Sequence, residues 1–174
     1  MTRHPVPDVP RPGQESVWDH PRPPRLERTP RRIRVTVTRA DGSELVVADT
    51  TEAFRVLETS HPPSWYLPAS VITPGVLAEA PGASFCEWKG RARYVSVVDP
   101  ADGTVLADHA GWVYDDPTPP FGELAGAVSF YPGRVGSASV DGEVARPQPG
   151  GFYGGWVTDD VAGPVKGGPG SSGW

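Results

Sequence analysis

Three Asp-Gly dipeptides, each placed between two segments of alternating apolar and polar residues, constrain the fold more than any other feature of the sequence. They are Asp41-Gly42 between residues 33–38 and 44–49, Asp102-Gly103 between 94–99 and 104–114, and Asp141-Gly142 between 134–140 and 143–145. An Asp-Gly pair supplies the positive φ angle that a tight turn needs, and a period of two is typical of a half-buried strand. The pattern predicts three hairpins and a mostly antiparallel sheet protein.

Long helices are not expected. The 22 prolines and 21 glycines make up about a quarter of the 174 residues. No segment keeps apolar residues at helical spacing for more than about two turns. The sequence predicts only short helices, at 69–72 and at 121–125, the latter after Pro119-Pro120, because proline is favoured in a first helical turn.

The length and the cysteine content restrict the class of protein. A chain of this length can form one domain and bury a core without a disulfide or a metal. Cys86 is the only cysteine in the sequence, which excludes internal disulfides, cysteine-rich zinc sites and CxxC redox sites. No apolar run approaches about 18 residues, and residues 1–12 lack the hydrophobic core of a signal peptide. We expect a soluble, cytoplasmic protein that does not associate with membranes.

Charge is distributed unevenly along the chain. Residues 1–34 contain eight of the sixteen Lys and Arg residues against four acidic residues, and the remainder carries a formal charge of −9. Because an acidic body repels polyphosphate, we expect no nucleic-acid partner. Arginine alternates with proline over residues 1–32, which favours an extended arm that docks on the acidic body in a salt-sensitive manner. The alternative is an arm that binds nucleic acid or a membrane surface.

The last 28 residues, 147–174, are rich in glycine and proline, a composition typical of disorder. They also carry large apolar side chains, among them Phe152, Tyr153 and Trp156. Leaving such side chains in water would forfeit about 1.5 to 3 kcal/mol each, so we expect this tail to wrap the sheet. The predicted organisation is an arm at 1–32, a β domain at 33–146 and a packed tail at 147–174.

The densest cluster of reactive side chains lies at residues 85–94 (FCEWKGRARY). If this segment is a strand, Gly90 interrupts it, and a glycine inside a strand marks a bulge that could turn Lys89 into a cavity. A lysine beside apolar walls loses its charge readily and suits Schiff-base chemistry, and Glu87 could act as a general base or as an ion-pair partner. The alternative is a ladder of charged side chains on a solvated edge.

A second cluster surrounds His61, which Pro62-Pro63 follows. The prolines hold the segment extended and reduce the entropy lost when the imidazole is fixed. With Ser60 beside it and Cys86 elsewhere, His61 could belong to a nucleophile and base pair. No G-x-S-x-G motif supports such a pair, and the default interpretation of Cys86 is a small buried apolar residue.

Metal and phosphate sites are not predicted. The four histidines, His4, His20, His61 and His109, are scattered, and none belongs to a local pair with chelating spacing. The sequence lacks a GxxxxGK[ST] motif, and the glycines of 167–170 do not open a helix. We therefore expect neither a metal nor a cofactor.

Aromatic residues are the remaining candidates for a site. Rings on strands or rigid loops can wall a pocket for a planar or cyclic ligand, which a few ionisable groups then orient. The alternative is that the same rings fill the core, because leucine and isoleucine are scarce. The predicted ligand-binding residues are His61, Trp65, Tyr66, Glu87, Trp88, Lys89, Trp112 and Tyr114.

Several motifs, taken in order, resemble the DUF427 family over about residues 33–140. They are ADT (48–50), ETSHPP (58–63), WYLP (65–68), FCEWKGRARY (85–94), WVY (112–114) and VSFYP (128–132). The flanks at 14–27 and 147–170 look like those of a bacterial single-domain branch.

This resemblance implies a single domain of two small antiparallel sheets, like the β-tent of Mss4-like proteins. Members of that architecture often hold zinc through paired CxxC motifs, which this sequence lacks. Some bind cyclic ligands between the sheets. The family also carries a nucleotidyltransferase-like label, but the sequence has no Gly-Ser followed by Asp-x-Asp to hold two magnesium ions.

The sequence is compatible with three functions. The first is binding of a small planar or cyclic molecule in an aromatic-walled cleft between the sheets, with or without catalysis. The second is a protein-interaction or structural module with no small-molecule site. The third is an enzyme that uses Cys86 or Lys89.

Overall fold

The computed structural model describes residues 4–174 and is mainly β, as predicted. The strands are β1 (Glu15–Ser16), β2 (Arg25–Thr29), β3 (Ile33–Thr38), β4 (Glu44–Thr50), β5 (Ala53–Leu57), β6 (Ser64–Tyr66), β7 (Leu77–Cys86), β8 (Gly90–Val98), β9 (Val105–Val113), β10 (Val128–Phe130), β11 (Ser137–Val140), β12 (Glu143–Val144), β13 (Arg146–Pro147), β14 (Trp156–Val157) and β15 (Val161–Ala162). Two 3-10 helices, η1 (Ala69–Val71) and η2 (Pro119–Leu124), lie close to the predicted short helices.

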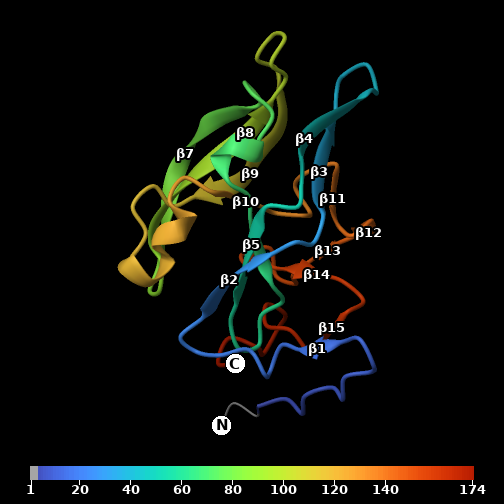
Figure 1. The fold of residues 1–174 in the computed structure, drawn as a ribbon, viewed down its shortest axis with the longest axis vertical. Helices are drawn as coiled ribbons and strands as arrows, with labels where there is room; N and C mark the ends of the chain where they lie inside the picture. Colours follow the sequence, from blue (N-terminus) through green and yellow to red (C-terminus); the bar gives the residue numbers. More distant parts are fainter. Residues whose placement is uncertain (1–3) are drawn as a thin grey trace.

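Two four-stranded antiparallel sheets form the upper part of the molecule (Figure 1). One has the strand order β10-β9-β8-β7 and the other the order β12-β11-β3-β4. The alternation predicted for 33–38 places Ile33, Val35 and Val37 in the main core, where they meet Val95 and Val97 of β8. Three smaller sheets, β1-β15, β13-β14 and β2-β5-β6, accompany this predicted pair.

All three predicted Asp-Gly turns are present. The turns join β3 to β4, β8 to β9 and β11 to β12. Gly42, Gly103 and Gly142 each have a positive φ angle, which a residue with a side chain adopts only with strain. The hairpin prediction is therefore confirmed in position and in mechanism.

The segment predicted as a separate arm contributes a strand to the fold. Residues Arg25–Thr29 form β2, which pairs antiparallel with β5 in the three-stranded sheet. Pro24 and Pro30 flank this strand and remove no hydrogen bond from its interior. A strand before the boundary predicted after residue 32 therefore pairs with a strand after it.

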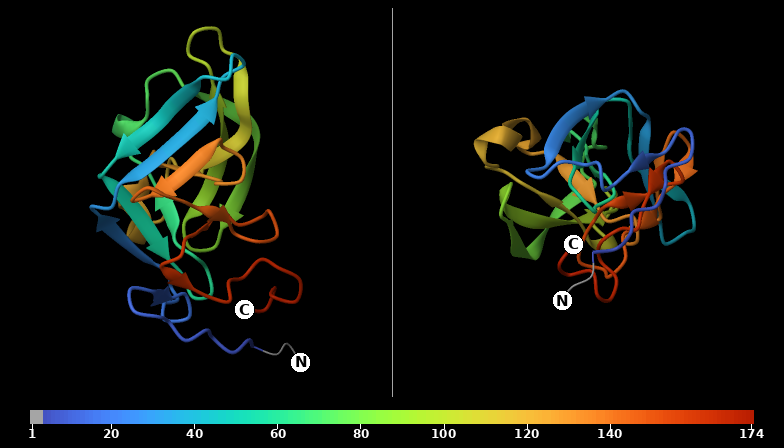
Figure 2. Two further views of the ribbon diagram at one scale, coloured as in Figure 1. Left: turned by 90° about the vertical axis from the view of Figure 1, so that its right-hand side faces the viewer. Right: turned by 90° about the horizontal axis from the view of Figure 1, so that it is seen from below.

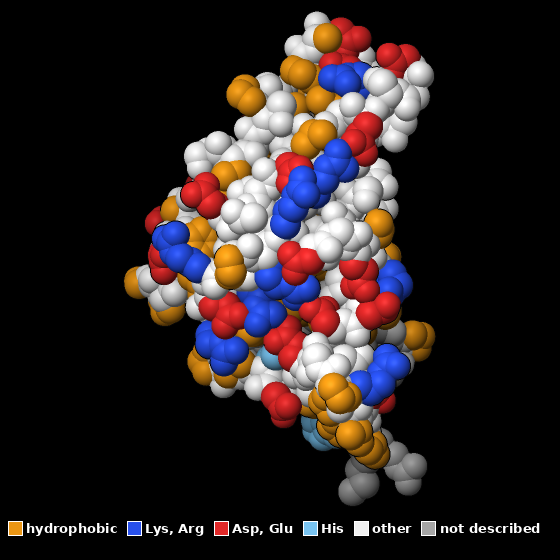
Figure 3. Space-filling model, turned by 45° about the vertical axis from the view of Figure 1, so that its right-hand side comes forward, with side chains coloured by type: hydrophobic (Ala, Val, Ile, Leu, Met, Phe, Trp, Pro, Cys, Tyr) orange, Lys and Arg blue, Asp and Glu red, His pale blue; other side chains and the backbone are white. Residues whose placement is uncertain are grey.

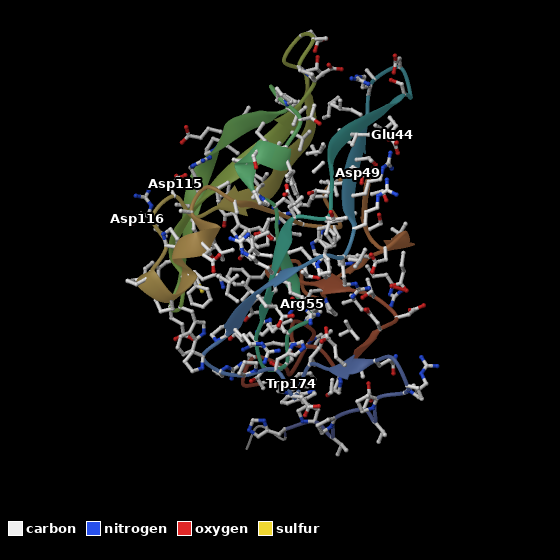
Figure 4. All side chains as sticks on the ribbon, in the orientation of Figure 1. Glu44, Asp49, Arg55, Asp115, Asp116 and Trp174 are labelled. Atoms are coloured by element: carbon white, nitrogen blue, oxygen red, sulfur yellow. The ribbon has the colours of Figure 1, made fainter. Side chains whose placement is uncertain are left out.

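Arginines of the first 34 residues contact acidic groups of the body. Arg31 lies 2.7 Å from Asp141 and 2.6 Å from Asp160, and Arg32 lies 2.7 Å from Asp49. Arg55 of β5, labelled in Figure 4, contacts Glu15 of β1 and Glu27 of β2 at 2.5 Å each. Basic and acidic side chains lie side by side on the face shown in Figure 3.

The C-terminal segment closes the lower end of the molecule. Its strand β14 pairs with β13, and β15 pairs in parallel with β1, so the two ends of the chain lie together (Figure 2). Trp156 is 1% exposed, and its indole nitrogen donates a hydrogen bond to the Phe130 carbonyl at 2.9 Å. No helix among residues 4–174 combines the length and apolarity needed to cross a bilayer.

Candidate ligand-binding cavity

A cavity of about 430 Å³ lies where the three-stranded sheet meets the lower ends of β7, β8 and β9. The C-terminal segment forms its remaining wall. The lining residues are Val56, Glu58, His61, Pro62, Ser64, Tyr66, Ser84, Phe85, Cys86, Glu87, Trp88, Lys89, Tyr94, Trp112, Tyr114, Tyr131, Gln148, Phe152, Tyr153, Gly154 and Lys166. This volume lies within the range of small-molecule sites.

Seven of the eight predicted site residues line this cavity, and Trp65 does not. Trp65 and Tyr66 are neighbours on β6, and successive side chains of a strand point to opposite faces. Tyr66 faces the cavity, whereas Trp65 packs against Trp156 in the main core, with ring centroids 6.3 Å apart. Trp65 therefore stabilises the fold behind the cavity wall.

The segment 85–94 forms two strands, and residues 87–89 form the turn between them. Strand β7 ends at Cys86 and β8 begins at Gly90, whose φ angle is +97°, and these two residues face each other across a hairpin. The turn leaves Glu87 exposed at the rim and buries Lys89, which is 8% exposed. Gly90 does redirect Lys89 into a cavity, through a turn and not through a bulge.

Lys89 is a buried cation next to aromatic rings. Its ammonium nitrogen lies 5.8 Å from the ring centroid of Tyr114 and 5.7 Å from that of Phe121, distances typical of cation–π contacts. Burial alone would lower the pKa of Lys89, but the acidic groups of Tyr66, Cys86 and Glu58 outweigh it, and the pKa is raised. Schiff-base chemistry needs a neutral amine, so this environment disfavours that role.

Hydrogen bonds to Gln148 fix the orientation and the tautomer of His61. The Gln148 amide oxygen accepts the Gly155 N–H at 3.1 Å, and its nitrogen donates to the Lys166 carbonyl at 2.7 Å. With the amide orientation set, its nitrogen also donates to Nδ1 of His61 at 3.0 Å. Nδ1 is therefore unprotonated, and the neutral ring carries its proton on Nε2.

The same surroundings keep His61 uncharged. Burial, reinforced by the positive charges of Lys166 and Arg22, lowers the pKa of His61 from 6.5 to about 4. The Nδ1 lone pair is occupied by Gln148, and among residues 4–174 no hydrogen bond joins His61 to Cys86. The nucleophile and base pair considered as an alternative is therefore not assembled, although both residues line one cavity.

Interlocked aromatic rings make the opposite wall rigid. The Trp112 indole nitrogen donates to the Tyr66 hydroxyl at 3.2 Å, and the two rings meet edge to face. Tyr131 packs on Trp112 with centroids 4.6 Å apart. Burial raises the pKa of both Tyr66 and Tyr114, so their hydroxyls stay neutral. This wall offers flat apolar surface with few polar groups.

A comparison with protein families gives one match. The model described as "Domain of unknown function (DUF427)" matches residues 25–143, which is more than half of the chain. The chain belongs to the DUF427 family. No similar sequence is found among curated proteins.

The DUF427 match ends before the residues that close the cavity. Gln148, Tyr153 and Lys166 lie after residue 143, yet Gln148 holds His61 and Tyr153 meets the His61 ring edge to face at 4.7 Å. Sequence analysis predicted a packed tail but missed these residues as site residues. The available signal was the pair of aromatic residues at 152–153 between glycines, which is unusual for a linker.

The described residues offer no metal site in this DUF427 protein. Across 4–174, no three His, Cys, Asp or Glu side chains are grouped to hold an ion. The ionisable side chains that line the cavity, besides its tyrosines, are two lysines, two carboxylates, a neutral imidazole and a thiol.

Gly154 lies against the cavity wall and gives a first testable prediction. A Cβ atom at this position would lie 2.1 Å from the ring of Trp112. We expect Gly154→Ala to lower the free energy of unfolding by about 1 to 3 kcal/mol, since a packed ring must move. Urea denaturation measures this change.

The matched control is Gly122→Ala, where a Cβ would meet nothing within 4 Å. This exposed position should change stability by less than about 0.5 kcal/mol. Equal effects at the two positions would mean that Trp112 is free to move away from residue 154.

Proposed function

We propose that this DUF427 protein binds a small planar or cyclic molecule in the cavity at the β7–β8 hairpin. The observation that carries the proposal is a hollow of about 430 Å³ with interlocked aromatic walls and a neutral imidazole of fixed tautomer. Rings held in this way give a planar ligand contact area at little cost in ordering. We place this binding in the cytoplasm, where the free thiol of Cys86 in the wall stays reduced.

Binding without catalysis accounts for the protonation states better than catalysis does. A general base needs a free lone pair and a pKa near neutrality, and His61 has neither. A lysine nucleophile needs a lowered pKa, and that of Lys89 is raised. The groups in the cavity are fixed donors and fixed charges, which orient a ligand.

The alternative of a purely structural or interaction module is supported less well. It requires the aromatic residues to fill the interior, yet Trp88 and Tyr131 border an open volume. The exposed side chains of Phe85 and Phe152 lie at the same cavity and suit a ligand entrance. A partner protein on this surface would cover that entrance.

A thermal-shift screen of planar metabolites tests the proposal. A ligand present at a hundred times its Kd stabilises the folded state by about 2.7 kcal/mol, which corresponds to roughly 5 to 10 °C in a chain of this length. We expect Trp88→Ala to abolish the shift of any hit, because Trp88 lines the cavity.

Trp18→Ala is the matched control. Trp18 is also a half-buried tryptophan, but it packs on Trp174 away from the cavity, with ring centroids 5.9 Å apart. Its loss should lower the unfolding midpoint and leave the ligand-induced shift unchanged. A screen without hits, or hits that Trp88→Ala leaves intact, would contradict the proposed function.

A further inference from the structure

The ammonium group of Lys89 has no anionic partner within residues 4–174. The side chain is 92% buried, and none of the ion pairs in this part of the chain involves it. Tyr66 stays a neutral phenol because burial raises its pKa. The thiol of Cys86 is only a weak hydrogen-bond partner for a cation. Taking an ammonium out of water without a paired anion is strongly unfavourable.

The other charged groups of the cavity are already engaged or lie at its rim. Glu58 lies 3.5 Å from Arg22, which neutralises it, and Glu87 is exposed to solvent. Lys166 donates to the main-chain oxygen of Trp174 (labelled in Figure 4) at 3.0 Å. Lys89 is thus the buried cation of the cavity that has no carboxylate at ion-pair distance within residues 4–174, although Tyr66, Cys86 and Glu58 together keep it protonated.

Two further hydrogen-bond donors belong to the same cavity wall. The protonated Nε2 of His61 is a fixed donor, because Gln148 occupies Nδ1. The indole nitrogen of Trp88 is buried and has no hydrogen-bond partner in the structure. With Lys89, these groups can donate hydrogen bonds but cannot accept them, so they favour an acceptor-bearing, anionic ligand and repel a cation.

We infer that the ligand of this cavity is a planar ring acid, whose carboxylate pairs with Lys89 while its ring lies on the aromatic wall. A carboxylate carries one negative charge and matches the one buried cation without an ion-pair partner, whereas a phosphate dianion would leave an excess charge buried. The aromatic contacts of Tyr66, Trp112 and Tyr114 suit the ring. This inference rests on the proposed function and adds to it the chemical class of the ligand.

Matched acid and amide probes test the inference by calorimetry at neutral pH and constant salt. The pairs are benzoate with benzamide, indole-3-carboxylate with its carboxamide, and quinoline-2-carboxylate with its carboxamide. Each pair keeps the ring and changes only the charge. We expect the acid of the best-binding pair to bind at least tenfold more tightly than its amide.

Three variants assign that preference. Lys89→Met should remove it, and Lys89→Arg should keep most of it. Arg91→Met is the matched control, because Arg91 is an exposed cation of β8 that does not line the cavity. That variant should retain the preference for acids.

The outcomes separate this inference from the proposed function. If amides bind as tightly as acids, or Lys89→Met keeps the preference for acids, the inference is overturned and ring binding stands. If no probe of either series binds at millimolar concentration, the proposed function fails and the inference fails with it.

Discussion

Replacing Trp156 with alanine is expected to lower the free energy of unfolding by about 3 to 5 kcal/mol, the range typical of a fully buried tryptophan. Trp156 is 1% exposed, packs on Trp65 and donates its indole N–H to the Phe130 carbonyl. The substitution removes this hydrogen bond and leaves a large void in the main core. Urea denaturation followed by circular dichroism measures the change, and an unaltered m-value shows that the same surface is exposed on unfolding.

Two comparison variants test whether the loss of stability in Trp156→Ala comes from the buried ring. Phe152→Ala, in the same C-terminal segment but 72% exposed, should change stability by less than about 0.5 kcal/mol. Trp156→Phe keeps most of the ring volume. Its loss in the free energy of unfolding should lie between those of Phe152→Ala and Trp156→Ala. A loss below about 1 kcal/mol for Trp156→Ala would mean that residues 147–174 are not docked as the structure has them.

This prediction matters for the cavity because Trp156 lies in the segment that completes it. Its main-chain nitrogen donates to the Pro63 carbonyl at 2.9 Å, next to the loop that carries His61. Gln148 and Lys166, on either side of Trp156 in sequence, position the imidazole and close the wall. The tail is thus a structural part of the site, although the DUF427 match ends at residue 143.

Local sequence signals predicted the local features of the fold. The three Asp-Gly turns and the alternation over 33–38 act through contacts a few residues apart, so sequence alone indicates strand, turn and buried face. The structure of residues 1–32 was harder to predict. Their prolines suggested an extended arm, whereas Arg25–Thr29 pairs with β5, a strand that is distant in sequence. Strand pairing over such distances leaves no local pattern.

The site was predicted in its residue types more completely than in its geometry. Lys89 and His61 were found because each lies beside a glycine or a proline that fixes the backbone. The partners that decide their chemistry come from distant segments: Gln148 for the imidazole, and Tyr66 and Glu58 for the ammonium. Trp65 was assigned to the cavity because adjacent aromatic residues on a short strand do not reveal which of them faces it.

Acid should weaken this protein through His61. The folded state lowers the pKa of His61 to about 4, whereas the unfolded chain keeps the ordinary value of 6.5. Below pH 6.5 the unfolded form takes up a proton that the folded form does not, so stability is complete above pH 6.5 and falls toward pH 4. We expect a loss of about 2 to 3 kcal/mol across this window, from about 1.4 kcal/mol per pKa unit. Urea denaturation at half-unit pH intervals measures it.

Glu15 and His109 affect stability in other pH ranges. The loss of stability between pH 6.5 and 4 can therefore be assigned to His61 by experiment. The pKa of Glu15 is lowered to about 2, because its hydrogen bond to Arg55 and its contact with His20 outweigh burial, so its contribution is lost only below pH 4.5. The pKa of His109 is raised by the Pro81 carbonyl and Asp108, so its contribution is lost as pH rises above 6.5.

His61→Gln removes the titrating ring and should flatten the profile between pH 6.5 and 4.5, whereas His109→Gln should leave this part of the profile unchanged. Lys166 and Arg22 face His61, with Lys89 beyond them, and their positive charges oppose protonation of the ring. A slope that persists in His61→Gln would mean that the ring is solvated and that Gln148 does not hold it neutral.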